Sequence, residues 1–91
     1  MQLSDAIVAY LRETGLEQPV LEVQVVEAWP HVMGDVVTKL TRSVEVKDGV
    51  LIVRVNSAAL KTQLFENRFE LVRKLNEAVG AQAIRDCRIL G

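Results

Sequence analysis

The sequence predicts one α+β domain in which helices pack on a small three-stranded sheet. Three observations carry this prediction: helical spacing of apolar residues in the first and third quarters, a hairpin signature around Asp48-Gly49, and an alternating apolar segment near the end. A chain of 91 residues is long enough to close a single core and little more. We therefore expect residues 1–91 to form a single domain.

Two helices are predicted in the first third of the chain. Apolar residues recur three to four apart across residues 4–14, and Gly15 suits the left-handed position that ends such a helix. Pro19 suits the first turn of a second helix. The predicted core side of this second helix consists of Val20, Leu21, Val25, Val26 and Trp29.

A bend is expected where Pro30 follows Trp29, because a proline disfavours helical backbone at the residue before it. A short helix over residues 31–40 should follow this bend. Gly34 lies within it and would allow that turn to approach a neighbouring element closely.

The most regular pattern of the chain predicts a β-hairpin over residues 43–55. Asp48-Gly49 is a dipeptide typical of the two-residue type I′ turn, and β-branched residues fill both flanks. The alternation places one set of side chains on the core side, namely Val44, Val46, Leu51, Val53 and Val55. Their neighbours Glu45, Lys47, Ile52 and Arg54 then lie on the opposite face.

A long helix and a third strand are predicted after the hairpin. Asn56 or Ser57 can cap the helix, Gly80 can end it, and a weak break near Glu66-Asn67 can divide it. Its apolar residues at helical spacing are Leu60, Leu64, Phe65, Leu71, Val72, Leu75 and Val79. Residues 84–90 alternate through Cys87 and Ile89, which predicts a final strand beside the hairpin.

The residues available for chemistry favour a binding protein over an enzyme. One histidine, one cysteine and dispersed acids supply no convergent catalytic set, and the isolated glycines form no phosphate-binding loop. The same inventory offers no cluster with zinc-ligand spacing. We expect no catalytic residues, no metal, no cofactor and no small-molecule substrate.

His31 and Cys87 are both expected to be structural. His31 stands four residues before Asp35, a spacing that favours a hydrogen bond on a helix surface. Cys87 lies in the predicted last strand, where a buried thiol behaves as a small apolar side chain.

The sequence indicates a cytoplasmic protein. A single cysteine allows no disulfide within the chain, and the first residues lead directly into an amphipathic pattern without a signal peptide. No apolar run is long enough to cross a membrane, so we expect no membrane association.

Charge is distributed unevenly along the chain although the total is only −1. Residues 1–38 hold one arginine against six acids, a net charge of −5, whereas residues 39–61 hold five basic residues against two acids, a net charge of +3. The basic side chains near the hairpin are Arg42, Lys47, Arg54 and Lys61. They are candidates for a weak contact with a phosphate backbone. The alternative is a solvated sheet face, which the lack of aromatic residues on these strands favours.

Trp29 is the candidate contact for a protein partner. Tryptophan is enriched at the centres of protein interfaces, so an exposed Trp29 would be an anchor for a partner. The structural alternative, which we favour, is that it fills the junction between the N-terminal helices and the sheet.

The ordered landmarks resemble those of the DciA-like family of bacteria, once described only as a domain of unknown function. Trp29 and Gly34 match W-x4-G, residues 48–57 match DG-x-L-x-V-x-V-x-S, and residues 75–80 match L-N-x3-G. Leu64 and Ile89 complete the pattern, which therefore extends over nearly the whole chain.

The resemblance implies a KH-like fold and a role in DNA replication. Members of the family bind the replicative DnaB-type helicase, assist its loading and touch DNA themselves. Many members also carry a long basic tail, which these residues lack, and the chain has no GxxG loop of the kind by which KH domains clamp nucleic acid. We therefore expect a non-enzymatic replication factor whose DNA contact is weak, with a protein-interaction module that binds no nucleic acid as the alternative.

Overall fold

The computed structural model describes residues 7, 13, 15 and 17–91. Its helices and strands follow in the order α2 (Glu17–Leu40), β1 (Thr41–Lys47), β2 (Val50–Val55), α3 (Ala58–Glu66), α4 (Arg68–Val79) and β3 (Asp86–Leu90). The predicted α+β class and this order of elements are confirmed. The helix predicted over residues 4–14 lies almost wholly outside the described residues, and the KH-like assignment stays a prediction.

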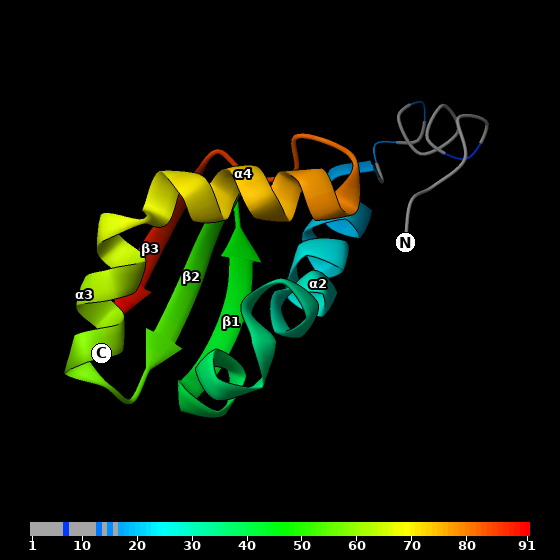
Figure 1. Cartoon of the computed structure of the whole chain (residues 1–91). Helices are drawn as coiled ribbons and strands as arrows, with labels where there is room; N and C mark the ends of the chain where they lie inside the picture. The colour runs from blue at the N-terminus through cyan, green and yellow to red at the C-terminus, as the bar shows by residue number, and fades with distance from the viewer. Residues whose placement is uncertain (1–6, 8–12, 14, 16) are drawn as a thin grey trace.

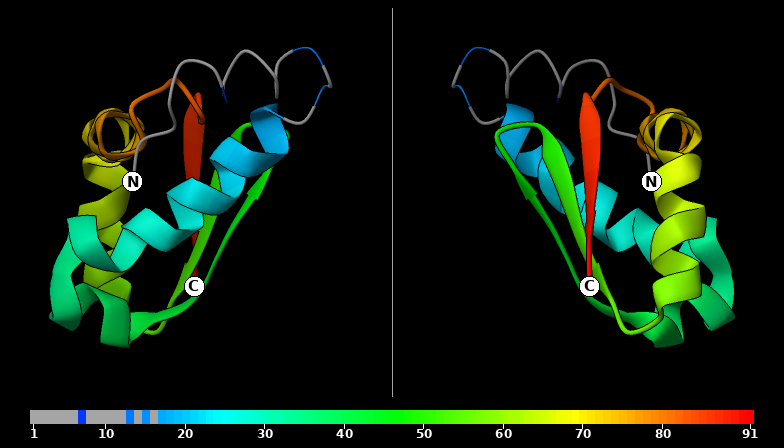
Figure 2. Two further views of the ribbon diagram at one scale, coloured as in Figure 1. Left: turned by 90° about the vertical axis from the view of Figure 1, so that its right-hand side faces the viewer. Right: turned by 90° about the vertical axis from the view of Figure 1, so that its left-hand side faces the viewer.

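The three strands form one mixed sheet with β2 in the centre (Figure 1). β1 and β2 are antiparallel, and β2 and β3 are parallel. The two edge-on views in Figure 2 show α3 and α4 on one side of the sheet, and α2 packs against both α4 and β1. No other described element covers the opposite face, and its charged residues are exposed.

The Asp48-Gly49 turn has the predicted type I′ geometry, because both residues have positive φ angles, 53° and 79°. The turn is also held from two sides. The Glu22 carboxylate accepts a hydrogen bond from the Gly49 amide at 3.1 Å, and the Gly49 carbonyl accepts one from the Arg85 amide at 2.8 Å. The Arg85 guanidinium donates to the Asp48 carbonyl. The hairpin tip is thus fixed to α2 and to the segment that leads into β3.

The bend in the N-terminal helical region lies at Gly34 and not at Pro30, so the predicted position is wrong. Helix α2 continues through Pro30. Its buried residues precede the proline, and the partly buried Val32 and Met33 follow it, so core packing holds the helix on both sides. Gly34 has φ 84° and ψ 174°, a conformation that essentially only glycine adopts. A Cβ atom at Gly34 would meet nothing within 4 Å, so this glycine is required for its backbone and not for a close approach.

The predicted long helix is divided at Asn67, as the weak break indicated. Ser57 caps α3 by accepting a hydrogen bond from the Leu60 amide at 3.2 Å. Gly80 ends α4 in the left-handed conformation, with φ 82° and ψ 18°. Local capping chemistry therefore sets the first and last residues of this helical pair.

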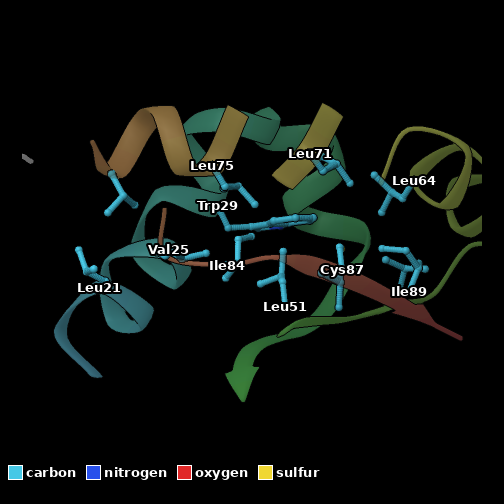
Figure 3. Packing of buried hydrophobic residues seen from close by; sticks show 14 of the residues in the cluster. Leu21, Val25, Trp29, Leu51, Leu64, Leu71, Leu75, Ile84, Cys87 and Ile89 are labelled. Atoms are coloured by element: carbon cyan, nitrogen blue, oxygen red, sulfur yellow. The ribbon is translucent and has the colours of Figure 1, made fainter. Parts of the chain in front are cut away.

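The core lies between the sheet and the helices and consists almost entirely of aliphatic side chains around Trp29 (Figure 3). The tryptophan ring lies between Leu75 on α4 and Leu51 on β2, and Ile84 lies on the same side of the ring as Leu51. Phe65, which the helical spacing placed with the core residues, is instead 54% exposed. Leu60 and Leu64 form the buried side of α3, and Phe65 lies about 100° further around the helix than Leu64.

Asn76 fixes the loop between α4 and β3 with three hydrogen bonds. Its side-chain oxygen accepts from the amides of Ala83 and Ile84 at 2.9 and 3.0 Å, and its amide nitrogen donates to the Ile84 carbonyl at 2.9 Å. These backbone groups are partly buried and have no strand partner there. One side chain on α4 therefore positions the start of β3.

Candidate nucleic-acid interface

The open face of the sheet is built from every second residue of the three strands. Strand register places these residues in three cross-strand rows: Lys47–Val50–Asp86, Glu45–Ile52–Arg88 and Ser43–Arg54–Leu90. The charged members are all solvent-exposed, and Ile52 at the centre is partly buried. We call these nine residues the open sheet face. Its side chains point away from the core because their strand neighbours, such as Val53 and Cys87, point into it.

The four predicted basic residues occupy two places and do not form one cluster. Lys47 and Arg54 belong to the open sheet face, as the alternation predicted, but they lie in its first and last rows. Four residues along a strand correspond to about 13 Å. Arg42 and Lys61 instead line a shallow hollow of about 380 Å³ at the end of the sheet, beside Gly91.

Arg88 belongs to the same face and was not among the predicted residues. It lies beside Ile52 in the middle row, between the rows of Lys47 and Arg54. The sequence held a usable signal, because Cys87 and Ile89 alternate as core residues and leave Arg88 pointing outward. With Arg88, basic side chains occur in all three rows of the open sheet face.

Acidic side chains offset part of this positive charge. Glu45 lies 3.9 Å from Arg54, and both side chains are about half exposed. Asp86 lies in the same row as Lys47. The face therefore carries three basic and two acidic residues, which favours a weak phosphate contact over a tight one. Solvent screens the Glu45–Arg54 pair, so its release on ligand binding costs little.

Trp29 is buried, which excludes its role as an exposed anchor in this conformation. Its side chain is 2% exposed, and its indole nitrogen donates to the Thr41 hydroxyl at 3.3 Å. That hydroxyl donates in turn to the Val37 carbonyl at 2.7 Å. Trp29 thus joins α2 to the start of β1, as the structural alternative held. Any contribution of Trp29 to partner binding stays a prediction, and it would act by positioning α2.

His31 and Cys87 have structural surroundings. His31 is exposed, and Gly34 interrupts the helix between it and Asp35, so no hydrogen bond joins this described pair. Cys87 is 4% exposed, and burial together with the neighbouring Asp86 carboxylate raises the pKa of its thiol to about 12. At neutral pH the thiol is therefore protonated and poorly reactive.

The hollows of the described part of the chain are shallow. One, of about 320 Å³, lies between α2 and α4 and contains Gln24, Glu27 and His31 but no serine, cysteine or lysine nucleophile. Among residues 7, 13, 15 and 17–91 no group of three acidic, histidine or cysteine side chains could hold a metal ion. None of the helices in this part is long and apolar enough to cross a membrane.

These features define a small α+β domain whose described helices cover one face of the sheet and leave exposed charged residues on the other. The chain belongs to the DciA family, described as "Dna[CI] antecedent, DciA", whose model matches residues 2–89. The family resemblance identified from the sequence is thereby confirmed.

Similar proteins occur in the bacterial genera Streptomyces and Mycobacterium. A UPF0232 protein of Streptomyces coelicolor is 33% identical over 93 aligned residues, which cover all of this chain and 49% of that protein. A UPF0232 protein of Mycobacterium tuberculosis is 32% identical over 80 residues, which cover 88% of this chain and 43% of that protein. The chain therefore spans about half the length of the curated relatives it matches.

Proposed function

We propose that this chain is a non-enzymatic accessory factor of DNA replication that binds the replicative DnaB-type helicase and makes a weak contact with DNA. The observation that carries the proposal is the match of residues 2–89 to the DciA family. The helicase partner is the role implied for that family. A helicase partner also implies that the chain acts in the cytoplasm.

The DNA half of the proposal is supported by the open sheet face. Lys47, Arg54 and Arg88 present exposed basic groups there, and the lack of a covering element among the described residues leaves room for a phosphate backbone. Arg42 and Lys61 extend the basic region around the end of the sheet. The nearby Glu45 and Asp86 limit the affinity.

A direct titration tests the helicase half. The chain, labelled with a fluorophore, is titrated with the purified DnaB-type helicase of the same organism, and fluorescence anisotropy reports binding. We expect saturable binding with a fixed stoichiometry. A folded chain that shows no saturation would refute the helicase role.

Charge reversal tests the DNA half separately. We expect Lys47→Glu with Arg54→Glu to weaken retention on single-stranded and duplex DNA at low salt, while helicase binding persists. A plot of the logarithm of DNA affinity against the logarithm of salt concentration should have a shallower slope in this variant. The slope should change by about 0.7–0.9 for each phosphate group that is no longer neutralised. The matched control is Lys39→Glu with Lys74→Glu, which changes the net charge equally on exposed sites of α2 and α4. Unchanged DNA retention in the first variant would contradict the proposed DNA binding.

A protein-interaction module without DNA contact is the second candidate. The net charge of −1 and the pairing of Arg54 with Glu45 favour it, because few basic groups remain free for phosphates. In this case the wild-type chain binds helicase but shows no salt-sensitive retention on DNA.

A further inference from the structure

Two exposed phenylalanines bracket an arginine at the junction of α3 and α4, a corner of the helical layer (Figure 1). Phe65 is 54% exposed and Phe69 is 70% exposed, although large aromatic side chains usually contribute to the core in so small a domain. Arg68 lies between them in the sequence. We call Phe65, Arg68 and Phe69 the aromatic elbow.

The three side chains of the aromatic elbow hold one another in place. The guanidinium carbon of Arg68 lies 4.2 Å from the centre of the Phe65 ring and 4.6 Å from that of the Phe69 ring. The same guanidinium donates a hydrogen bond to the Phe65 carbonyl at 2.9 Å. These contacts order three long side chains before any partner arrives, which lowers the entropic cost of binding through them.

Arg68 differs from Arg73, the next arginine on α4, in that it pairs with no carboxylate of the described residues. Arg73 is paired with both Glu70 and Glu77, and its hydrogen bond with Glu70 lowers the pKa of that carboxyl below its ordinary value. No ion pair of this kind involves Arg68 within the described part of the chain. Its remaining N–H groups are therefore available to a carboxylate from outside, which an arginine binds in a two-pronged geometry.

The composition around the elbow favours a protein partner over nucleic acid. The exposed Glu66 carboxylate directly follows Phe65 in the sequence and would repel a phosphate backbone there. Each ring also has one face occupied by Arg68, which leaves less surface for a base to stack on. Aromatic residues and arginine surrounded by a charged rim are the usual composition of a protein-interface centre.

We propose that the aromatic elbow is a docking site for a protein surface that presents an apolar area with a carboxylate in it. The apolar area packs on the outer sides of Phe65 and Phe69, and the carboxylate pairs with Arg68. The elbow belongs to the helical layer, whereas the open sheet face lies on the other side of the sheet (Figure 2). The inference rests on the proposed function, in that the helicase is the partner used to test it.

The test compares variants of the whole chain in the helicase titration described above. We expect Phe65→Ala with Phe69→Ala to weaken helicase binding by at least about tenfold, because truncated interface centres lose most of the binding energy. Arg68→Glu should weaken it by at least as much, and Arg68→Lys by less, since a lysine retains the charge without the two-pronged geometry. The control is Val23→Ala with Val36→Ala, which truncates two exposed apolar residues of α2.

The possible outcomes distinguish a failure of the proposed docking site from a failure of the proposed helicase role. Loss of binding in the elbow variants alone, with unchanged thermal unfolding, supports the docking site. Wild-type affinity in the double alanine variant and in Arg68→Glu overturns the docking site and leaves the helicase role intact. Elbow variants that keep helicase binding but lose retention on single-stranded DNA assign the elbow to nucleic acid and overturn the proposal. A wild-type chain that does not bind helicase overturns the proposed function and this inference together.

Discussion

The two faces of the sheet differ in what they contribute, although the same strands build both. On β2, Leu51, Val53 and Val55 are 0–2% exposed and belong to the same buried cluster as Trp29, whereas Arg54 points to solvent beside Glu45. The inner face therefore stabilises the fold through buried apolar side chains, whereas the outer face carries exposed charged side chains. Substitutions on the inner side should lower stability, and those on the outer side should change binding while leaving stability nearly constant.

Trp29→Ala should produce the largest loss of stability. Truncation of a fully buried tryptophan leaves a cavity between α2, α4 and the sheet, and we expect the free energy of unfolding to fall by about 3–5 kcal/mol. Urea denaturation followed by far-UV circular dichroism measures the change. A loss below about 1 kcal/mol would show that the ring is not packed as described.

Asn76→Ala should cost less, about 1–3 kcal/mol, because it removes the side-chain hydrogen bonds to partly buried backbone groups of Ala83 and Ile84, of which the Ala83 amide keeps only its bond to the Ala81 carbonyl. Hydrogen exchange should also quicken at the Ala83 and Ile84 amides. Asn67→Ala is the matched control, since its exposed side chain donates only to the Gln63 carbonyl. Equal losses in the two variants would contradict the role assigned to Asn76.

Gly34→Ala should cost about 1–2 kcal/mol, because a Cβ atom strains the backbone there without meeting any neighbour. Gly80→Asn is the comparison, since asparagine tolerates the left-handed conformation that ends α4. Thermal unfolding of both variants gives the difference. A stabilised Gly34→Ala protein would indicate that the chain straightens into one continuous helix at this position.

Arg54→Ala should have the smallest effect on stability, within about 0.5 kcal/mol, because its ion pair with Glu45 is exposed and screened by solvent. A double-mutant cycle with Glu45→Ala measures the coupling between the two residues. DNA retention at low salt should nevertheless decrease in Arg54→Ala and increase in Glu45→Ala. A coupling above about 1 kcal/mol would mean that the outer face is also structural.

Local sequence signals predicted the elements whose geometry is set by neighbouring residues. The Asp48-Gly49 turn, the Ser57 cap and the Gly80 end of α4 depend on backbone preferences within a few residues, so they were predictable. The alternation along β1 and β2 correctly placed Lys47 and Arg54 on the face opposite the core. These signals need no knowledge of the rest of the fold.

The remaining features depend on contacts between distant segments. The bend at Gly34 follows from packing that keeps α2 helical through Pro30, which overrides the local effect of a proline. Arg42 lies at the irregularity in strand register between Thr41 and Ser43, and Lys61 lies on α3, so neither belongs to the open sheet face. The side of α3 that is buried depends on its packing against β2 and β3, which turns Leu60 and Leu64 to the core and leaves Phe65 exposed.

The most direct test of the proposed role is the titration of the labelled chain with the replicative DnaB-type helicase of its own organism. We expect saturable binding that survives charge reversal at Lys47 and Arg54 and weakens when Phe65 and Phe69 are truncated. The positive control is the helicase of a related bacterium, titrated to saturation with its own DciA-family protein. If the folded wild-type chain shows no binding at the same concentrations, the central claim is contradicted.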